Sequence, residues 1–240
     1  MVQTVKVPPE FSYILENIKE ISYNVNNAKA KYRSEGDTVE IMAVTKTVEP
    51  EKVNFAVSQG ITLLGENRVQ EYLSKKDSYD KSAKVHIIGH LQTNKVKYII
   101  NDVDMIQSVD SLKLANEINR LAEKNSRVMD VLLEVNIGDE ASKSGVSAQA
   151  LYELAGQISV LDNIRIRGLM AIPPIGADES VFEHMKELFE GLKEKKLRNM
   201  QADVLSMGMS GDYELAIKHG SNLIRIGTKL FGARKYLEVL

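Results

Sequence analysis

The sequence predicts an α/β protein folded as a single (β/α)8 barrel, a TIM barrel, with an extra helix at its N-terminus. Short β-type runs alternate with amphipathic helical runs along the whole chain. No Gly/Ser-rich linker or low-complexity stretch divides it, and its 240 residues are close to the roughly 250 typical of this fold. Eight right-handed βαβ units in succession close into a barrel. One domain is therefore expected over residues 1–240.

The extra helix is expected over residues 9–33, where apolar side chains recur on one helical stripe. The strands that follow are short runs rich in Val, Ile, Leu and Met. They are predicted at 39–46, 61–67, 84–91, 104–109, 128–137, 164–172, 202–207 and 222–226. A helical run follows each of them, at 50–58, 68–75, 93–100, 111–124, 148–159 (capped by Ser147), 180–195, 211–219 and 228–240.

An open, doubly wound sheet is the alternative arrangement of such alternating elements. That fold predicts a glycine-rich fingerprint directly after the first strand. Residues 46–49, Lys-Thr-Val-Glu, contain no glycine. The barrel is therefore favoured.

Composition excludes several classes of function. Lys and Arg number 31 against 33 Asp and Glu, a net charge of −2, which excludes the strongly basic surface of a nucleic-acid-binding protein. The chain has no cysteine, so it has no disulfide, thiolate metal site or cysteine nucleophile. No apolar run approaches 18 residues, and the first residues lack the apolar core of a signal peptide. A soluble cytoplasmic protein without a membrane partner is expected.

A barrel of this kind carries its active site at the carboxyl ends of its strands. The polar residues predicted at those ends are Lys46, Asn67, His90, Asn136, Ser206 with Ser210, and Arg225 with Thr228. They come from different strands, so only a closed barrel brings them together.

Lys46 follows the apolar run 41–44. Desolvation there would favour the neutral amine, the nucleophile that forms a Schiff base with a carbonyl. The alternative is a solvated lysine at a strand end. Arg225 lies inside an apolar strand and needs a partner. That partner is a ligand, or else a carboxylate such as Asp203 or Glu134.

The segments 205–212 and 225–232 are rich in small residues and each joins a strand to a helix. Turns of this kind between the seventh and eighth strands cradle phosphate groups in many barrels. The alternative is two ordinary strand–helix turns.

Other polar residues are given structural roles. His86 is expected in the core, whereas His90 at the strand end could contact a ligand. The two histidines lack a third metal ligand at a familiar spacing, so no metal site is predicted. Glu66 and Glu71 are interpreted as surface or helix-start charges.

Several blocks of sequence are shared with a known family. They are AVTKT at 43–47, GENRVQE at 65–71, HIIGHLQTNK at 86–95, VNIGDEASKSG at 135–145, GLMAI at 168–172, LSMGMS at 205–210 and RIGTKLFG at 225–232. In these blocks the chain resembles the pyridoxal phosphate homeostasis proteins (YggS/PROSC type), which are related to the barrel domain of alanine racemase. The chain differs from the usual family pattern at Gly211 and Asn222, close to the phosphate-binding turns.

The resemblance implies that pyridoxal 5′-phosphate (PLP) forms a reversible Schiff base with Lys46. Asn67 would lie near the cofactor ring, and Arg225 would face the pyridine nitrogen. Ser206, Ser210, Gly227 and Thr228 would hold the phosphate. Arginine is only a donor, so it pairs with an unprotonated ring nitrogen, and such a ring is a poor electron sink.

The function implied is intracellular PLP homeostasis: the protein buffers PLP, supplies it transiently to PLP-dependent apo-enzymes, and has no catalytic turnover. The alternative is a PLP-dependent amino-acid racemase, which needs a second acid/base group opposite Lys46. In two-domain racemases that group is a tyrosine from a second domain, which this chain is expected to lack. Tyr236 has no evident reason to lie over the cofactor. A PLP-free Schiff-base aldolase and a ligand-free interaction module are further alternatives. A monomer is expected.

Overall fold

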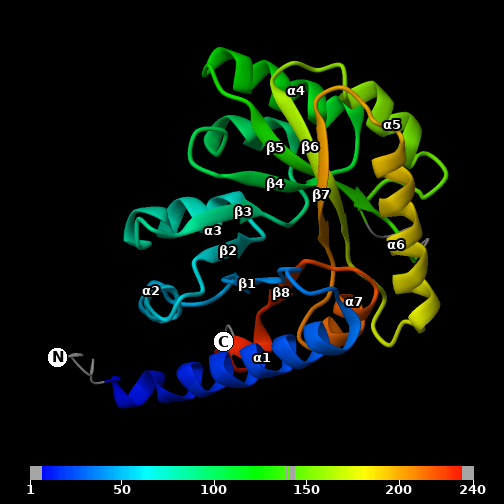
Figure 1. Ribbon diagram of the computed structural model, residues 1–240. Coiled ribbons are helices and arrows are strands. Elements are labelled where there is room, and N and C mark those ends of the chain that lie inside the picture. Colours follow the sequence, from blue (N-terminus) through cyan, green and yellow to red (C-terminus); the bar gives the residue numbers. More distant parts are fainter. Residues whose placement is uncertain (1–6, 139, 141–143, 234–240) are drawn as a thin grey trace.

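Eight parallel strands close into a barrel in the computed structural model of the chain, which describes residues 7–138, 140 and 144–233 (Figure 1). Each strand pairs with its neighbour in sequence, and β1 pairs with β8. The strands are β1 (Glu40–Val44), β2 (Leu63–Glu66), β3 (Lys84–Ile87), β4 (Met105–Val109), β5 (Met129–Val135), β6 (Ile164–Ala171), β7 (Met200–Ser206) and β8 (Leu223–Ile226). The predicted barrel is thus confirmed.

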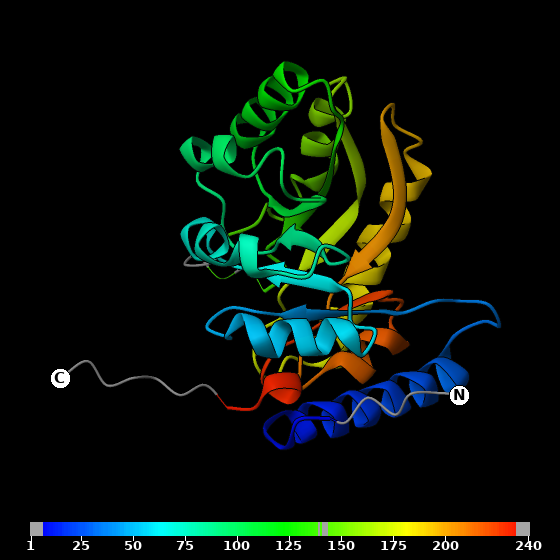
Figure 2. The same cartoon turned by 90° about the vertical axis from the view of Figure 1, so that its left-hand side faces the viewer.

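Helices surround the barrel, with α4 on the opposite side from α1 (Figures 1 and 2). The α-helices are α1 (Ser12–Tyr32), α2 (Pro50–Ser58), α3 (Val69–Lys75), α4 (Leu112–Lys124), α5 (Leu151–Ile158), α6 (Glu179–Glu194), α7 (Tyr213–Lys218) and α8 (Thr228–Phe231). The 3-10 helices are η1 (Pro9–Phe11), η2 (Lys76–Ser78) and η3 (Thr93–Tyr98). None of the helices in the described part of the chain has the length and apolar character needed to cross a bilayer.

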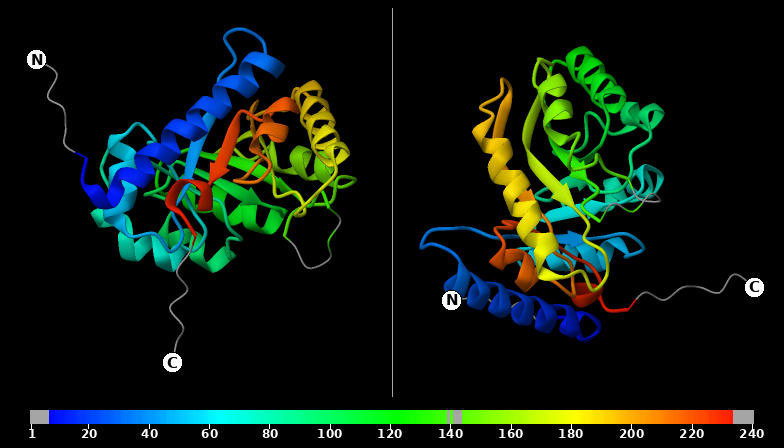
Figure 3. Two further views of the ribbon diagram at one scale, coloured as in Figure 1. Left: turned by 90° about the horizontal axis from the view of Figure 1, so that it is seen from below. Right: turned by 90° about the vertical axis from the view of Figure 1, so that its right-hand side faces the viewer.

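The predicted N-terminal helix is present and packs against α7 and α8, the last two helices that the structure describes. Helix α1 runs across α7 and α8 (Figure 3). Asn17 Nδ2 donates to the carbonyl oxygen of Leu230 at 3.0 Å, and Glu20 forms a 2.8 Å ion pair with Lys229. Because α8 is only one turn long, α1 supplies the outer apolar cover that a longer eighth helix would otherwise give.

The strands bury side chains on both of their faces, as a parallel barrel requires. The larger apolar cluster lies between the barrel wall and the helices and includes Ile106, Val131 and Phe182. Smaller clusters, such as that of Met42, Leu63 and Leu223, come from the alternate positions of the strands and fill the interior. On other strands these interior positions carry polar side chains, namely His86, Gln107, Ser206 and Arg225.

Strands β7 and β8 pair in register at Ser206 and Leu223. Main-chain hydrogen bonds also join them, from the Asn222 N–H to the Leu205 carbonyl oxygen at 3.2 Å and from the Arg225 N–H to the Gly208 carbonyl oxygen at 2.9 Å. Side chains from the turn before β8 complete this seam. Asn222 accepts a 2.8 Å hydrogen bond from the Leu205 N–H and donates to the carbonyl oxygen of Asp203 at 2.6 Å. The hydroxyl of Ser221 donates toward the carbonyl oxygens of β7 and its following turn. Asn222, a departure from the family pattern, therefore has a structural role in closing the barrel.

Three predicted helices differ from the structure. Residues 93–98 form a 3-10 helix, whose three-residue turn aligns the buried Val96 and Ile99. The helix predicted at 148–159 begins at Leu151, and Ser147 instead closes the preceding turn by accepting from the Ala150 N–H. The final helix, predicted at 228–240, ends at Phe231, and the next residue, Gly232, has a φ of +86° that a helix does not allow. Residues 234–240 of the predicted range, including Tyr236, lie outside the described residues.

Gly168 is needed where the register of β6 shifts. Its φ is +140°, and a Cβ there would overlap the carbonyl oxygen of Val204 on β7. We expect Gly168→Ala to lower the free energy of unfolding by about 1–3 kcal/mol from backbone strain alone. Gly156→Ala is the matched control, because its site in α5 is open, and it should stabilise the fold by about 0.5–1 kcal/mol. Urea unfolding measures both, and equal effects would contradict this account.

Candidate functional site

A cavity of about 240 Å³ opens at the carboxyl ends of the strands. It contains six of the seven predicted site residues, and Ser206 is the exception. The lining residues are Val44, Lys46, Asn67, Ile88, Ile172, Met209, Ser210, Gly211, Arg225, Gly227 and Thr228. The barrel thus brings together an amine, an amide, a guanidinium and two hydroxyls that are far apart in sequence.

Arg225 enters this cavity from the barrel interior and is only 3% exposed. Its two terminal nitrogens donate at 2.7 Å to Ser206 Oγ and to the carbonyl oxygen of Ala171. Burial lowers its pKa to about 10, which leaves the guanidinium charged at neutral pH. Neither suggested carboxylate is bonded to it: Asp203, in the middle of β7, pairs with Arg167 of β6 at 2.7 Å.

Glu134, the second suggested partner, is not hydrogen-bonded to Arg225 either and instead accepts from Ser144 Oγ. The buried cation is therefore held by neutral acceptors within the described part of the barrel. Neutral acceptors satisfy the N–H groups without cancelling the charge. An anionic or lone-pair acceptor on a ligand would be attracted to that charge in a low-dielectric setting.

Ser206 lies beneath the cavity, fully buried, and links Arg225 to a chain of polar side chains across the barrel. Ser206 Oγ donates to Gln107 Oε1 at 2.8 Å, and Gln107 Nε2 lies 2.9 Å from His86 Nδ1. Burial lowers the pKa of His86 to about 3, so its ring is neutral and accepts from the amide. His86 is the core histidine that the sequence predicted.

The strand end that carries Lys46 is fixed from outside the barrel by Glu66. This carboxyl is fully buried, and its Oε1 accepts from Thr45 Oγ1 at 2.7 Å and from the Tyr79 hydroxyl. Burial raises the pKa of Glu66. The interpretation of Glu66 as a surface charge is wrong, because the residue faces α3 and η2 on the outer side of β2 rather than solvent.

A second contact fixes the residue after Lys46. Glu71 Oε1 accepts from the Thr47 N–H and from Lys75 Nζ, both at 2.5 Å, and Lys75 Nζ also reaches the carbonyl oxygen of Thr45 at 3.2 Å. Burial alone would raise the pKa of Glu71, but these hydrogen bonds lower it overall. Thr47 has a φ of +61°, an unusual value for a β-branched residue. Contacts from two glutamates, one to Thr45 and one to Thr47, thus hold the strained turn that contains Lys46.

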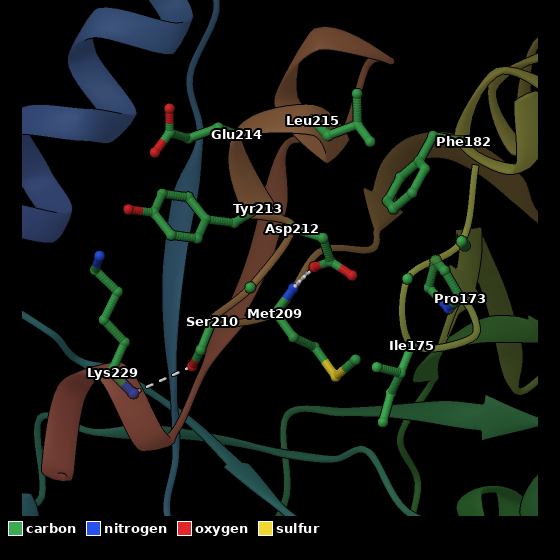
Figure 4. A pocket seen from close by; sticks show the side chains of 13 residues that line it. Pro173, Ile175, Phe182, Met209, Ser210, Asp212, Tyr213, Glu214, Leu215 and Lys229 are labelled. Carbon is green, nitrogen blue, oxygen red and sulfur yellow. Dashed lines mark hydrogen bonds between the residues drawn. The ribbon is translucent and has the colours of Figure 1, made fainter. Parts of the chain in front are cut away.

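Two loops form the opposite wall of the cavity. In the loop after β7, Ser210 Oγ accepts from the Lys229 N–H of α8 at 3.2 Å, and Asp212 Oδ1 accepts from the Met209 N–H at 2.6 Å (Figure 4). The first bond joins the β7 loop to the β8 loop that carries Gly227. A Cβ at Gly211 would meet nothing within 4 Å, so this departure from the family pattern is not required by packing.

Pockets of the same barrel face lie on either side of this cavity. One of about 700 Å³ shares Met209, Ser210 and Gly211 with it and extends toward Ile175 and Phe182 (Figure 4). Another, of about 580 Å³, contains His90 and Asn136. These two strand-end residues therefore do not line the cavity that contains Lys46.

The barrel carries a lysine and an arginine in one cavity at its mouth. The family model of the alanine racemase N-terminal domain matches residues 17–235, so the chain belongs to this class. Solved structures agree. An alanine racemase of Clostridium difficile has the same fold (TM-score 0.72, 16% identity, 94% of this chain and 59% of that one). The PLP-bound PipY of Synechococcus elongatus is 29% identical, with a TM-score of 0.77, and the match covers 91% of this chain and 100% of that one.

Curated relatives identify the family within this class. The pyridoxal phosphate homeostasis protein of Aquifex aeolicus is 44% identical over 82% of this chain and 87% of its own length. That of Escherichia coli is 34% identical over 93% of this chain and 97% of its own length. The chain belongs to the pyridoxal phosphate homeostasis protein family, as its sequence blocks suggested.

The buried carboxyl of Glu66 predicts a pH-dependent stability. Its folded-state pKa is raised above the ordinary 4.5, so the folded state binds the proton more tightly than the unfolded chain. This contribution therefore favours folding at low pH and is lost as pH rises through the two pKa values. Glu66→Gln keeps the acceptor for Thr45 and Tyr79. We expect its free energy of unfolding, relative to wild type, to increase as pH rises above 4.5.

Glu71→Gln is the control for this prediction, because the folded-state pKa of Glu71 is lowered. Its carboxylate stabilises the fold above the unfolded pKa, and that stabilisation is lost as pH falls. The variant should therefore become less stable relative to wild type as pH rises, the opposite sign. Urea unfolding at a series of pH values measures both, and differences that do not change with pH would reject the assignment.

Proposed function

We propose that this chain binds PLP reversibly, holds it as a Schiff base on Lys46, and so buffers or supplies it within the cell. The observation that carries the proposal is the convergence of Lys46, Arg225, Ser210 and Thr228 on one cavity. PLP has an aldehyde, a ring nitrogen and a phosphate. The cavity offers a nucleophile for the first, a donor for the second and hydroxyl donors for the third.

The phosphate would be held between the β7 and β8 loops, by the hydroxyls of Ser210 and Thr228 and by backbone that approaches closely at Gly227. Ser206 would act on the ligand through Arg225, to which it is bonded, rather than on the phosphate itself. Asn67 would contact the ring from the end of β2. Both loops are already joined by the bond from the Lys229 N–H to Ser210, which supports a prearranged cradle.

Arg225 supports a carrier rather than a catalyst. A guanidinium has no acceptor, so it can hydrogen-bond the ring nitrogen only when that nitrogen lacks a proton. An unprotonated ring withdraws electrons weakly, so the ring would then contribute little to the carbanion stabilisation that PLP supplies. The bond from Arg225 to Ser206 keeps the guanidinium in place for this role.

The cavity also lacks a second acid/base group among its described lining residues. Among these residues Lys46 is the one amine, since the others have apolar, amide, hydroxyl or guanidinium side chains or none. Racemisation needs proton transfer on both faces of the substrate carbon. The described cavity therefore favours a PLP carrier without racemase activity over a PLP-dependent racemase. A monomeric state, transient delivery to apo-enzymes and a cytoplasmic location remain predictions.

Replacement of Lys46 tests the attachment site. We expect Lys46→Ala to abolish the visible absorption of the protein–PLP adduct and the borohydride-trapped peptide, because no other amine lines the cavity. Its free energy of unfolding should stay within about 0.5 kcal/mol of wild type. Lys97→Ala removes an exposed lysine outside the cavity and should leave the adduct intact. Trapping spread over many lysines in the wild type would refute the proposal.

Turnover assays test the carrier role. We expect the PLP-loaded protein to racemise or transaminate amino acids no faster than free PLP at the same concentration, because the second acid/base group is absent from the described cavity. Chiral chromatography of alanine and other amino acids measures the rates. A rate well above that of free PLP, lost in Lys46→Ala, would favour the racemase alternative.

A further inference from the structure

A second cavity, of about 580 Å³, lies in the same barrel mouth beside the one that contains Lys46. It is bordered by the ends of β3 to β6, and Ile172 lines both cavities. Its lining residues are His90, Asp110, Glu134, Val135, Asn136, Ser144 and Ile172. Except for Ile172, none of them takes part in the site proposed for PLP.

Glu134 is an unusual residue to find at this position. It is only 5% exposed, and its Oε1 accepts from Ser144 Oγ at 2.8 Å. Its Oε2 is buried and has no hydrogen-bond partner among the residues that the structure describes. A buried oxygen without a partner has lost hydration and received nothing in exchange, which costs free energy. Burial accordingly raises the pKa of Glu134. The orphaned oxygen belongs to a residue of the cavity wall, so a ligand can supply the missing donor once the Glu134 carboxyl turns toward the cavity.

The other charged groups of this cavity favour a positively charged donor. Asp110 adds a second carboxylate, close enough to oppose ionisation of Glu134. His90 lies 3.9 Å from Asp110 and is mostly exposed. Arg225, the nearby cation, is already bonded to Ser206 and to a main-chain carbonyl. The side chain of Asn136 is bonded to the backbone of Glu140.

The apolar residues of the cavity wall indicate the chemical nature of the rest of the ligand. Val135 and Ile172 present apolar surface beside the carboxylates, and Ile172 is partly exposed. No group of three or more His, Asp or Glu among the described residues is arranged to hold a metal ion. A primary ammonium has three N–H donors and a full positive charge, which suits two carboxylates. An aliphatic chain suits the apolar wall.

We propose that this cavity binds the primary ammonium group of an aliphatic amine, with Glu134 Oε2 and the Asp110 carboxylate as its acceptors. The site itself stands on its own geometry. The biological use of this site rests on the proposed function, because PLP is an aldehyde and primary amines form Schiff bases with aldehydes. Ile172 would then be the partition between the carried aldehyde and the amine.

Calorimetric titration of the protein without PLP tests the site directly, with 1,4-diaminobutane as the probe. We expect saturable binding to one site, weakened at least tenfold in Glu134→Gln, which keeps the acceptor for Ser144 and removes the charge. Asp110→Asn is a second variant at a partly exposed position and should also weaken binding. Glu153→Gln removes an exposed carboxylate of α5 and should bind like wild type. The neutral analogue 1,4-butanediol should not bind.

Several outcomes would overturn the inference. They are absence of diamine binding to wild type, equal binding by both folded site variants, or equal binding of the neutral diol. Circular dichroism establishes that each variant is folded, and Asp110→Asn decides the case if Glu134→Gln is not. PLP binding by wild type is measured separately by absorbance. Failure there with intact diamine binding rejects the proposed function and leaves the ammonium site standing.

Discussion

The buried guanidinium of Arg225 is the constraint on which the barrel interior depends. A cation buried among strands needs hydrogen-bond acceptors around it, since the loss of its hydration is costly unless protein groups replace the water. Ser206 and the carbonyl oxygen of Ala171 provide those bonds, and Gln107 and His86 extend them across the barrel. A position that apolar side chains fill in most barrels is therefore polar, directly beneath the site.

Outside the barrel, carboxylates hold the turn that carries Lys46. Glu66 binds the side chain that precedes this lysine, and Glu71 binds the backbone that follows it. Because each contact crosses from β2 or α3 to the end of β1, the amine is positioned by elements other than its own. A side chain on a rigid strand end with such support is positioned more precisely than a side chain on a flexible loop.

The sequence predicted the barrel because each strand and most helices have a strong local pattern, and the helix at Pro50–Ser58 has the predicted bounds. It placed Lys46 and Arg225 well because strand ends of a barrel converge. It could not place Glu66 or Ser206, because inner and outer faces of a fully buried strand look alike in sequence. Residues 93–98 were missed as a 3-10 helix because short helical runs carry no signal for the turn size.

The seam between β7 and β8 has a consequence for how ligand and fold influence each other. These strands pair in register at one position, with main-chain hydrogen bonds on either side of it, and each strand leads into a loop of the site. A ligand held by both loops would bridge β7 and β8, the neighbouring strands with the shortest pairing in the barrel, and would act there as an additional cross-link. Its binding free energy then adds to the stability of the closed ring, by about 2.7 kcal/mol at a concentration one hundred times Kd. The empty protein would open first along this seam, and the loaded protein would open elsewhere.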